Sequence, residues 1–179
     1  GHNIKMSDAL SFKSLYQLVS IASISAFITK DYLKIEPFLI ESYNTLLQHK
    51  KNEKQAYYHI QILYSIANTL FRNKKFDESI HFLGLMLNQM TLNKKKHYKS
   101  FILKYKLLLA LNLNYNNQQD LAIKTLEALN TKKVTDLESM LNIQLSLIVL
   151  YFQKGAFKSA KNMFSKLYHT DSWYTEKAG

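Results

Sequence analysis

Apolar residues recur at helical spacing in four long segments of the chain, and a short polar break divides each segment into two stripes. Each segment therefore predicts two helices joined by a tight turn. We expect these helical hairpins at about residues 7–50, 53–91, 94–130 and 134–169. Lysine-rich runs separate one hairpin from the next and predict exposed connections. The pattern thus predicts an all-α fold of eight helices.

The fourth hairpin shows the pattern most clearly. Its expected stripes are Leu141, Leu145, Ile148 and Phe152, followed by Phe157, Ala160, Met163, Phe164 and Leu167. Gly155 lies between them and predicts a helix stop, because glycine adopts a left-handed conformation without steric cost. In the second hairpin Asn73 is the expected stop. Pro37 falls inside the expected second helix of the first hairpin, where it either kinks the helix or marks its first turn.

Composition supports the helical prediction. The 179 residues include only 4 Gly and 1 Pro, so a β-sandwich or barrel, which needs a turn about every 8–12 residues, would lack turn residues. Hydrophobic residues make up 47% of the chain, which is typical of a folded globular protein. Capping residues also indicate helix starts, with Ser7-Asp8 before the first apolar stripe and Thr135-Asp136 before the seventh.

A fixed set of residue types recurs at fixed spacing in all four hairpins. In the fourth hairpin it reads Tyr151-x3-Gly155-x-Phe157-x2-Ala160-x3-Phe164-x2-Leu167. The position of Gly155 is taken in the other copies by Asn117, Lys74 and Lys30, and that of Ala160 by Ala122, Ser79 and Ile35. An apolar residue before the turn and an aromatic one after it are expected to hold the turn together. The small residue one turn later is expected to let the two helices approach closely.

This pattern resembles the tetratricopeptide repeat over about 160 residues, within 3–170. The resemblance implies a right-handed α-α superhelix of about four hairpins. The copies are spaced 44, 43 and 38 residues, from Ile35 to Ser79 to Ala122 to Ala160, against about 34 in the family. The family's Trp and Gly in the first helix are missing, and no proline ends a unit. We therefore expect longer helices or connections than the family has.

The resemblance also implies that the first helices of the hairpins line a concave groove, which binds a peptide or helix of a partner protein. The expected partner-binding residues are Gln17, Ser20, Gln61, Tyr64, Asn68, Arg72, Lys104, Asn112, Asn142 and Ser146. Asn68 and Lys104 also suit the capture of a partner's terminal carboxylate, but Tyr64 and Leu108 lie where that clamp needs further polar groups. We therefore expect a protein-binding scaffold or adaptor that does not use this clamp.

The chain is strongly basic, with 24 basic and 13 acidic residues and a formal net charge of +11. Lysines and tyrosines interleave in 94–99 and 104–106, so a basic helical module that binds nucleic acid is the alternative function. All basic residues except Arg72 are lysines, whereas phosphate and base recognition favours the forked guanidinium of arginine. Tyr105 also lies on the apolar stripe. These two features favour the protein-binding hypothesis.

No pattern of a catalytic or metal site is present in the sequence, and we expect no enzyme activity, no cofactor and no metal. The histidines are scattered singly, at His49, His59, His81, His97 and His169. Cysteine is absent, which excludes disulfides and is compatible with the expected cytoplasmic location. The longest run without a charged residue or histidine, Ser14 to Thr29, has 16 residues and is shorter than the about 20 that a membrane span needs.

The two ends are interpreted separately. Gly1-His2 resembles the remnant of a cleaved expression tag and is set aside. A new cap and an aromatic pair begin at 169–174, so residues 171–179 are interpreted as the start of a truncated repeat or a capping helix. A truncated array predicts apolar side chains exposed on the last helix, because terminal repeats normally have a polar outer face.

Overall fold

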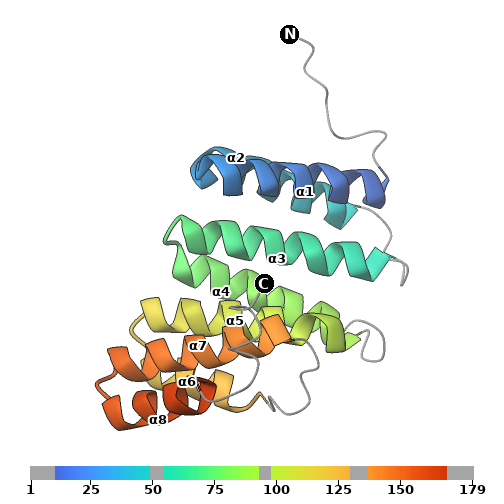
Figure 1. The fold of residues 1–179 in the computed structure, drawn as a ribbon. Coiled ribbons are helices and arrows are strands. Elements are labelled where there is room, and N and C mark those ends of the chain that lie inside the picture. Colours follow the sequence, from blue (N-terminus) through green and yellow to red (C-terminus); the bar gives the residue numbers. More distant parts are fainter. Residues whose placement is uncertain (1–10, 49–54, 93–97, 130–136, 169–179) are drawn as a thin grey trace, which may run out of the picture. The chain divides into compact units, whose positions relative to one another are not determined.

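A computed structural model describes residues 11–48, 55–92, 98–129 and 137–168 of the chain (Figure 1). Within these ranges it contains eight α-helices and no strand, which confirms the all-α prediction. The helices are α1 (Phe12–Thr29), α2 (Tyr32–Gln48), α3 (Ala56–Arg72), α4 (Phe76–Leu92), α5 (Tyr98–Tyr115), α6 (Gln119–Glu127), α7 (Leu137–Gln153) and α8 (Phe157–Tyr168). The expected helix starts at Ser7-Asp8 and Thr135-Asp136 lie outside the described residues. Helix α1 begins instead after Ser11, whose hydroxyl accepts a hydrogen bond from the Ser14 backbone N–H.

The chain divides into two compact units, which we call unit 1 (residues 1–105) and unit 2 (residues 106–179). The boundary falls inside α5, so the residues before Lys106 are described with unit 1 and the rest with unit 2. In unit 1, helices α1, α2 and α3 pack on one another and α4 packs on α3. In unit 2, α7 packs on both α6 and α8.

The turns between paired helices confirm the repeat found in the sequence. The backbone takes a left-handed conformation at the same repeat position in all four hairpins. The φ angles are 61° at Lys30, 62° at Lys74, 59° at Asn117 and 79° at Gly155. The prediction that α3 stops at Asn73 is confirmed, because Asn73 directly follows Arg72, the last residue of the helix. The φ of Asn73 is −81°, and the left-handed conformation lies one residue later, at Lys74.

Hydrogen bonds explain why the left-handed residue has this place. In the second, third and fourth hairpins the residue after it donates its N–H to the carbonyl five residues earlier, which closes a Schellman motif at the helix end. These bonds are Lys75 to Leu70 (2.9 Å), Gln118 to Leu113 (2.8 Å) and Ala156 to Tyr151 (2.8 Å). The position relative to the end of the first helix thus determines which residue becomes left-handed, and the asparagine preference at Asn73 is overridden.

Replacing two glycines by alanine is expected to change the free energy of unfolding in opposite directions. Gly155→Ala is expected to lower the free energy of unfolding by about 1 kcal/mol, because alanine is strained at a φ of 79°. Gly84→Ala is expected to raise it by about 0.5–1 kcal/mol, because Gly84 lies inside α4 with no atom within 4 Å of an added Cβ. Urea denaturation measures both. Destabilisation by Gly84→Ala would show that this helix position is more constrained than its open surroundings indicate.

The small residue that follows each turn is buried as the repeat predicts. Ser79 and Ala122 are fully buried and Ala160 is 6% exposed. Ser79 also donates its hydroxyl to the backbone carbonyl of Ala67 at 2.7 Å, which joins α4 to α3 at their closest approach. The aromatic residue after the turn packs against a ring that lies one position later in the sequence than the expected apolar partner. Phe76 contacts Phe71 and Phe157 contacts Phe152, with centroids 5.9 and 5.3 Å apart.

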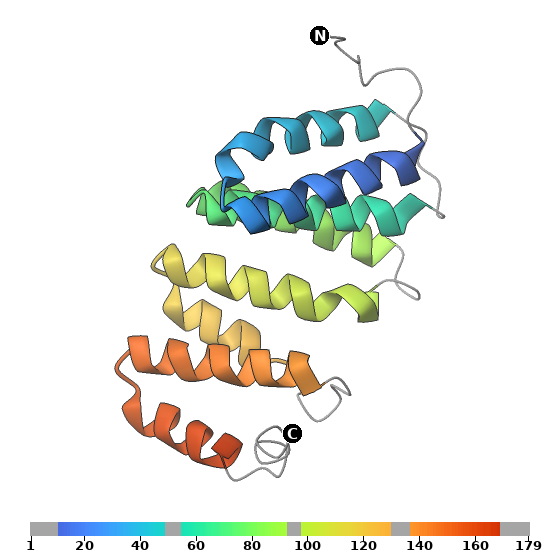
Figure 2. The same cartoon turned by 45° about the horizontal axis from the view of Figure 1, so that its top comes forward.

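The core of unit 1 lies where α1, α2 and α3 meet (Figure 2). It consists of Leu15, Val19, Leu39, Leu46, Ile62, Ile66 and Leu70, each 2% exposed or less. Pro37 lies in the second turn of α2, which starts at Tyr32, so it does not mark the first turn of this helix. Because this core includes residues of α1, α2 and α3, the first hairpin packs on the second through α3.

An ion pair also joins the first hairpin to the second. Glu36 of α2 accepts hydrogen bonds from the Lys75 ammonium (2.5 Å) and the Asn73 side-chain amide (2.6 Å), both in the α3–α4 turn. Partial burial alone would raise the pKa of Glu36, but these two bonds outweigh it and hold the pKa below its usual value. A similar pair in unit 2 joins Asp120 of α6 to Lys154 in the α7–α8 turn.

Glu36→Gln tests this link. A depressed carboxyl pKa stabilises the fold above the unfolded-state pKa of about 4.5, and this stability is lost as the pH falls through the folded-state pKa. At pH 7 the variant is expected to be less stable by about 1 kcal/mol, because a charge-assisted bond becomes a neutral one. Denaturation curves between pH 7 and pH 3 should show the difference shrinking below pH 4.5. A gap that stays constant with pH would contradict an electrostatic origin.

In unit 2, the prediction of which α7 residues are buried in the core is wrong. The helix buries Ile143, Leu147 and Leu150, whereas Leu145 and Phe152 are 42% and 64% exposed. Leu141 and Ile148, the other predicted core residues, are half-buried. Almost every face of α7 carries apolar residues, so periodicity alone does not single out the buried face.

Helix α8 agrees only in part with its predicted stripe. Ala160 and Leu167 are buried, but Phe157 and Phe164 are 59% and 49% exposed. Apolar side chains are thus exposed on α8, the last of the described helices, and the truncation of the array stays a prediction. Residues 171–179, interpreted above as a truncated repeat or cap, lie outside the described residues.

Candidate partner-binding surface

The predicted site residues of unit 1 lie on the first helices of two adjacent hairpins. Gln17 and Ser20 belong to α1, and the other members of this group belong to α3. Those on α3 are Gln61, Tyr64, Asn68 and Arg72, at a spacing of three, four and four residues that places them along one side of the helix. Helices α1 and α3 pack directly on each other. The structure thus brings the α1 and α3 candidates onto neighbouring helices of one unit.

A cluster of aromatic rings connects the starts of these helices. Tyr16 of α1 lies 6.4 Å from Tyr57 and 5.2 Å from Tyr58, measured between ring centroids. Tyr57 in turn lies 5.4 Å from Phe101 at the start of α5. The Gln61 side-chain amide donates a hydrogen bond to the Tyr57 hydroxyl at 3.1 Å. The amide of Gln61 is thereby held beside the rings on a half-buried surface.

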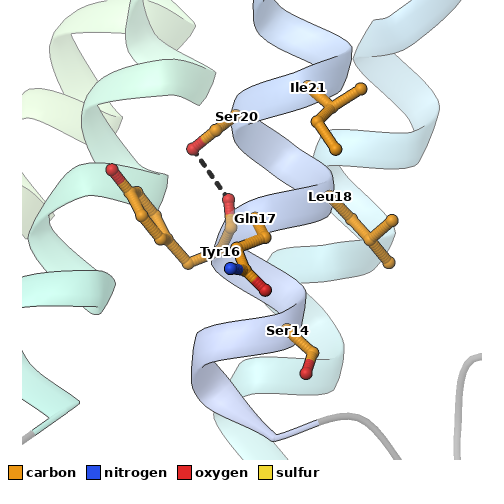
Figure 3. A pocket seen from close by; sticks show the side chains of 6 residues that line it. All are labelled: Ser14, Tyr16, Gln17, Leu18, Ser20 and Ile21. Carbon is orange, nitrogen blue, oxygen red and sulfur yellow. Dashed lines mark hydrogen bonds between the residues drawn. The ribbon is translucent and has the colours of Figure 1, made fainter.

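A shallow open hollow of about 610 Å³ lies over α1 (Figure 3). It is lined by Ser14, Tyr16, Gln17, Leu18, Ser20 and Ile21, so it contains two of the predicted site residues. Tyr16 and Ser20 lie on the side of α1 that faces α3, and Leu18 and Ile21 on the opposite side (Figure 3). The Ser20 hydroxyl donates to the backbone carbonyl of Tyr16 at 2.8 Å and is therefore already engaged within the helix.

The sequence prediction missed an exposed apolar stripe on α1, except for Ile24, which the repeat placed on the ligand surface with Gln17 and Ser20. We call it the α1 stripe, and its members are Leu18 (39% exposed), Ile21 (65%), Ile24 (60%) and Ile28 (71%). Their spacing of three, three and four residues places them along one face. The uncharged run Ser14 to Thr29 could have indicated this stripe. Such a helix has apolar residues on most of its surface, so any face that its neighbours leave uncovered exposes them.

The remaining members of the α3 group differ in exposure and charge. Burial raises the pKa of the Tyr64 phenol, although the positive charge of Arg72 opposes this shift. Tyr64 is therefore a neutral hydrogen-bonding group at every physiological pH. Asn68 is half-buried, and Arg72 is exposed at the end of α3, 6.0 Å from the Tyr32 ring. Arg72 thus belongs to the hairpin turns rather than to the aromatic cluster.

The other predicted site residues are not brought together by either unit alone. Lys104 is exposed on α5 in unit 1, while Asn142 is exposed and Ser146 half-buried on α7 in unit 2. Asn112 is a correction, because it is fully buried and donates its side-chain amide to the Leu108 carbonyl at 2.8 Å. A side chain with no exposed surface does not contact a partner. Asn112 lies one helical turn after Leu108 on α5, so both side chains point to the interior.

Chemistry other than binding has little support in the described residues. No group of three or more His, Cys, Asp or Glu side chains is placed to hold a metal ion in the ranges 11–48, 55–92, 98–129 and 137–168. Among the histidines, His59 is buried and His81 exposed, while His49, His97 and His169 lie outside the described residues. None of the helices in the described ranges has the length and apolar character needed to cross a membrane.

Comparison with known proteins adds no family to these observations. No family model, no curated protein and no solved structure matches the chain. The class defined by the structure is therefore an all-helical protein of repeated hairpins.

Proposed function

We propose that this protein is a tetratricopeptide-like scaffold or adaptor that binds a segment of a partner protein along α1 and α3. In this proposal the hairpins stack as a right-handed superhelix in the cytoplasm, and the protein has no catalytic activity of its own. The recurrence of the left-handed turn and of the buried small residue in successive hairpins supports such stacking.

The observation that carries the proposal is the α1 stripe beside the hollow. Three of its isoleucines are at least 60% exposed, and exposed apolar patches on folded proteins mark interaction surfaces. The other edge of the hollow carries Tyr16 and Ser20, next to the Tyr57 hydroxyl and the Gln61 amide. A surface with apolar residues on one edge and fixed polar groups on the other suits the side of an amphipathic helix or an extended peptide.

The partner's charge follows from the protein's own charge. The uncharged stripe lies between Lys13 and Lys30, and the whole chain carries a net charge of +11. A second copy of the chain would place like charges together, whereas a segment with acidic residues next to its apolar ones would be attracted. We therefore propose an acidic amphipathic segment as the ligand.

A double substitution in the α1 stripe tests this function. Ile21→Glu with Ile24→Glu places two charges on exposed positions, so the helix content should be unchanged and the stability nearly so. Proteins that copurify with the wild type from the source cell should be reduced at least about tenfold with this variant. The matched control is Leu92→Glu, which changes a leucine that is 76% exposed at the end of α4.

The outcomes separate protein binding from nucleic-acid binding. Partners that are retained by Leu92→Glu and lost with the double variant support the proposal. Equal retention by all three proteins would overturn it. A partner that is released by nuclease, with an affinity falling steeply as salt increases, would instead support the basic nucleic-acid module. Against that alternative, Tyr105 is only 8% exposed, so it offers no stacking platform.

A further inference from the structure

The turns of the first two hairpins form a second candidate site, away from the α1 stripe. The α1–α2 turn and the α3–α4 turn lie at the same end of unit 1 (Figure 2). Between them is an open pocket of about 340 Å³. It is lined by Lys30, Asp31, Tyr32 and Leu33 at the first turn and by Arg72, Asn73 and Lys74 at the second. We call this pocket the turn cradle. We infer that the turn cradle binds a dianionic phosphate group carried by a side chain of the partner protein.

Charge is the first argument for this inference. Three cationic side chains, Lys30, Arg72 and Lys74, line the turn cradle together with one carboxylate, that of Asp31. No ion pair joins any of the three cations to a carboxylate in the described part of the chain. Glu36, which lies on α2, is already bound to Lys75 and Asn73. The cradle thus keeps two uncompensated positive charges.

The one carboxylate in the cradle has a structural task. Asp31 accepts a hydrogen bond from the backbone N–H of Lys34 at 3.3 Å, so it caps the start of α2. Its single negative charge offsets one of the three cations, which leaves the net charge of two. The start of α2 at Tyr32 also places the positive end of a helix dipole at the cradle.

Arg72 has the geometry of an anion-binding side chain. It is the only arginine among the 24 basic residues of the chain. Its guanidinium lies 6.0 Å from the Tyr32 ring and 5.8 Å from the Phe71 ring. Rings on which a guanidinium packs leave its N–H edge available for paired hydrogen bonds to phosphate oxygens. Lysine provides no such fork, so the choice of arginine here has a chemical reason.

The backbone gives an independent observation. Lys30 and Lys74 both have φ angles near +60°, a conformation that costs a residue with a Cβ about 1 kcal/mol and that favours glycine or asparagine. The corresponding residue of the fourth hairpin is Gly155 and that of the third is Asn117. Lysine therefore occupies this strained position in the two turns that line the cradle, and turn formation does not require it there.

The charge of the cradle selects the ligand. A net charge of two matches a phosphate monoester, which carries about −1.5 to −2 at pH 7, better than a single carboxylate. The pocket volume is at the lower end of the range for small-molecule sites, which suits one phosphate group with part of its side chain. Only the identification of the carrier as a protein side chain rests on the proposed function. Phosphate binding itself does not.

Nuclear magnetic resonance titration of the full chain tests the inference. The probes are inorganic phosphate and the peptide Gly-Gly-phosphoserine-Gly-Gly, with the unphosphorylated peptide and chloride at equal ionic strength as controls. Both phosphate probes should shift the Lys30, Arg72 and Lys74 signals and saturate. Arg72→Gln should weaken binding at least about tenfold, and Arg72→Lys by less, because it keeps the charge and loses the fork. The charge-matched control Lys158→Gln, on α8, should have no effect beyond about twofold.

Several results would overturn the inference. One is an equal affinity of the wild type and Arg72→Gln for phosphate. Another is an equal loss with Lys158→Gln, which would indicate attraction by diffuse charge. An oligonucleotide without a terminal phosphate that binds the cradle more tightly than the phosphopeptide would assign it to nucleic acid. The Ile21→Glu and Ile24→Glu variant should retain phosphate binding, so failure of the α1 stripe and failure of the cradle are distinguishable.

Discussion

Ser79→Leu is expected to lower the free energy of unfolding by about 3 kcal/mol. Ser79 is fully buried where α4 crosses α3, and its hydroxyl reaches the Ala67 carbonyl at 2.7 Å. Leucine adds two heavy atoms at a fully buried contact between the two helices, which forces them apart and exposes part of the core. Urea denaturation of the purified variant measures the change.

Two further substitutions separate crowding from the lost hydrogen bond. Ser79→Ala removes the bond without adding volume and should cost about 1 kcal/mol, since the Ala67 carbonyl already lies within a helix. Ser159→Leu changes an exposed serine of α8 and should change stability by about 0.5 kcal/mol or less. If Ser79→Leu were as stable as Ser79→Ala, close approach of α3 and α4 would not be what the small residue provides.

Asn112→Leu is expected to raise the free energy of unfolding by about 2 kcal/mol. Asn112 has no exposed surface, and its side-chain oxygen has no hydrogen-bond partner among the described residues. Its amide nitrogen bonds to the Leu108 carbonyl, four residues earlier in the same helix. That carbonyl is positioned to accept the backbone N–H of residue 112 in any case. Leucine therefore replaces an unsatisfied buried amide with an apolar side chain of similar size.

Thermal and urea denaturation measure this gain, and Asn142→Leu is the matched control. Asn142 is exposed on α7, so the same substitution there should be nearly neutral. A loss of stability in Asn112→Leu would mean that the amide oxygen binds a group within the fold. In that case Asn112 would regain a functional role, in the interior instead of on a surface.

The sequence predicted the hairpins well because a turn depends on few local residues. The repeat aligned Lys30, Lys74, Asn117 and Gly155, and these are the four left-handed residues of the described chain. The identity of the side chain was a poorer guide than this alignment. Asn73 has a stronger preference for the left-handed conformation than lysine, yet the hydrogen bond from Lys75 to Leu70 places that conformation at Lys74.

The faces of the helices were harder to predict than their ends. On α7, apolar residues surround the helix, and only the packing of α6 and α8 selects Ile143, Leu147 and Leu150. On α5 the sequence assigned Asn112 to a surface because it is polar, and the fold buries it. Such positions depend on the neighbours of a helix, which its own period does not specify.

The candidate site was predicted in part. Gln17, Ser20, Gln61 and Tyr64 were assigned from the repeat, and the structure places them on neighbouring helices. The α1 stripe and the turn cradle were not predicted. The α1 stripe is exposed because the neighbouring helices leave one face of α1 uncovered, and the turn cradle forms only when two hairpins are packed.

The left-handed residue at each turn has a consequence for how such a chain can diversify. Main-chain hydrogen bonds maintain its backbone shape in the turns of the second, third and fourth hairpins. The four copies tolerate lysine, lysine, asparagine and glycine at this position. The tips of the hairpins can therefore exchange one charge or amide for another at a cost of about 1 kcal/mol, while the buried helices remain unaltered. Ligand preference at a hairpin turn is free to evolve separately from the architecture that carries it.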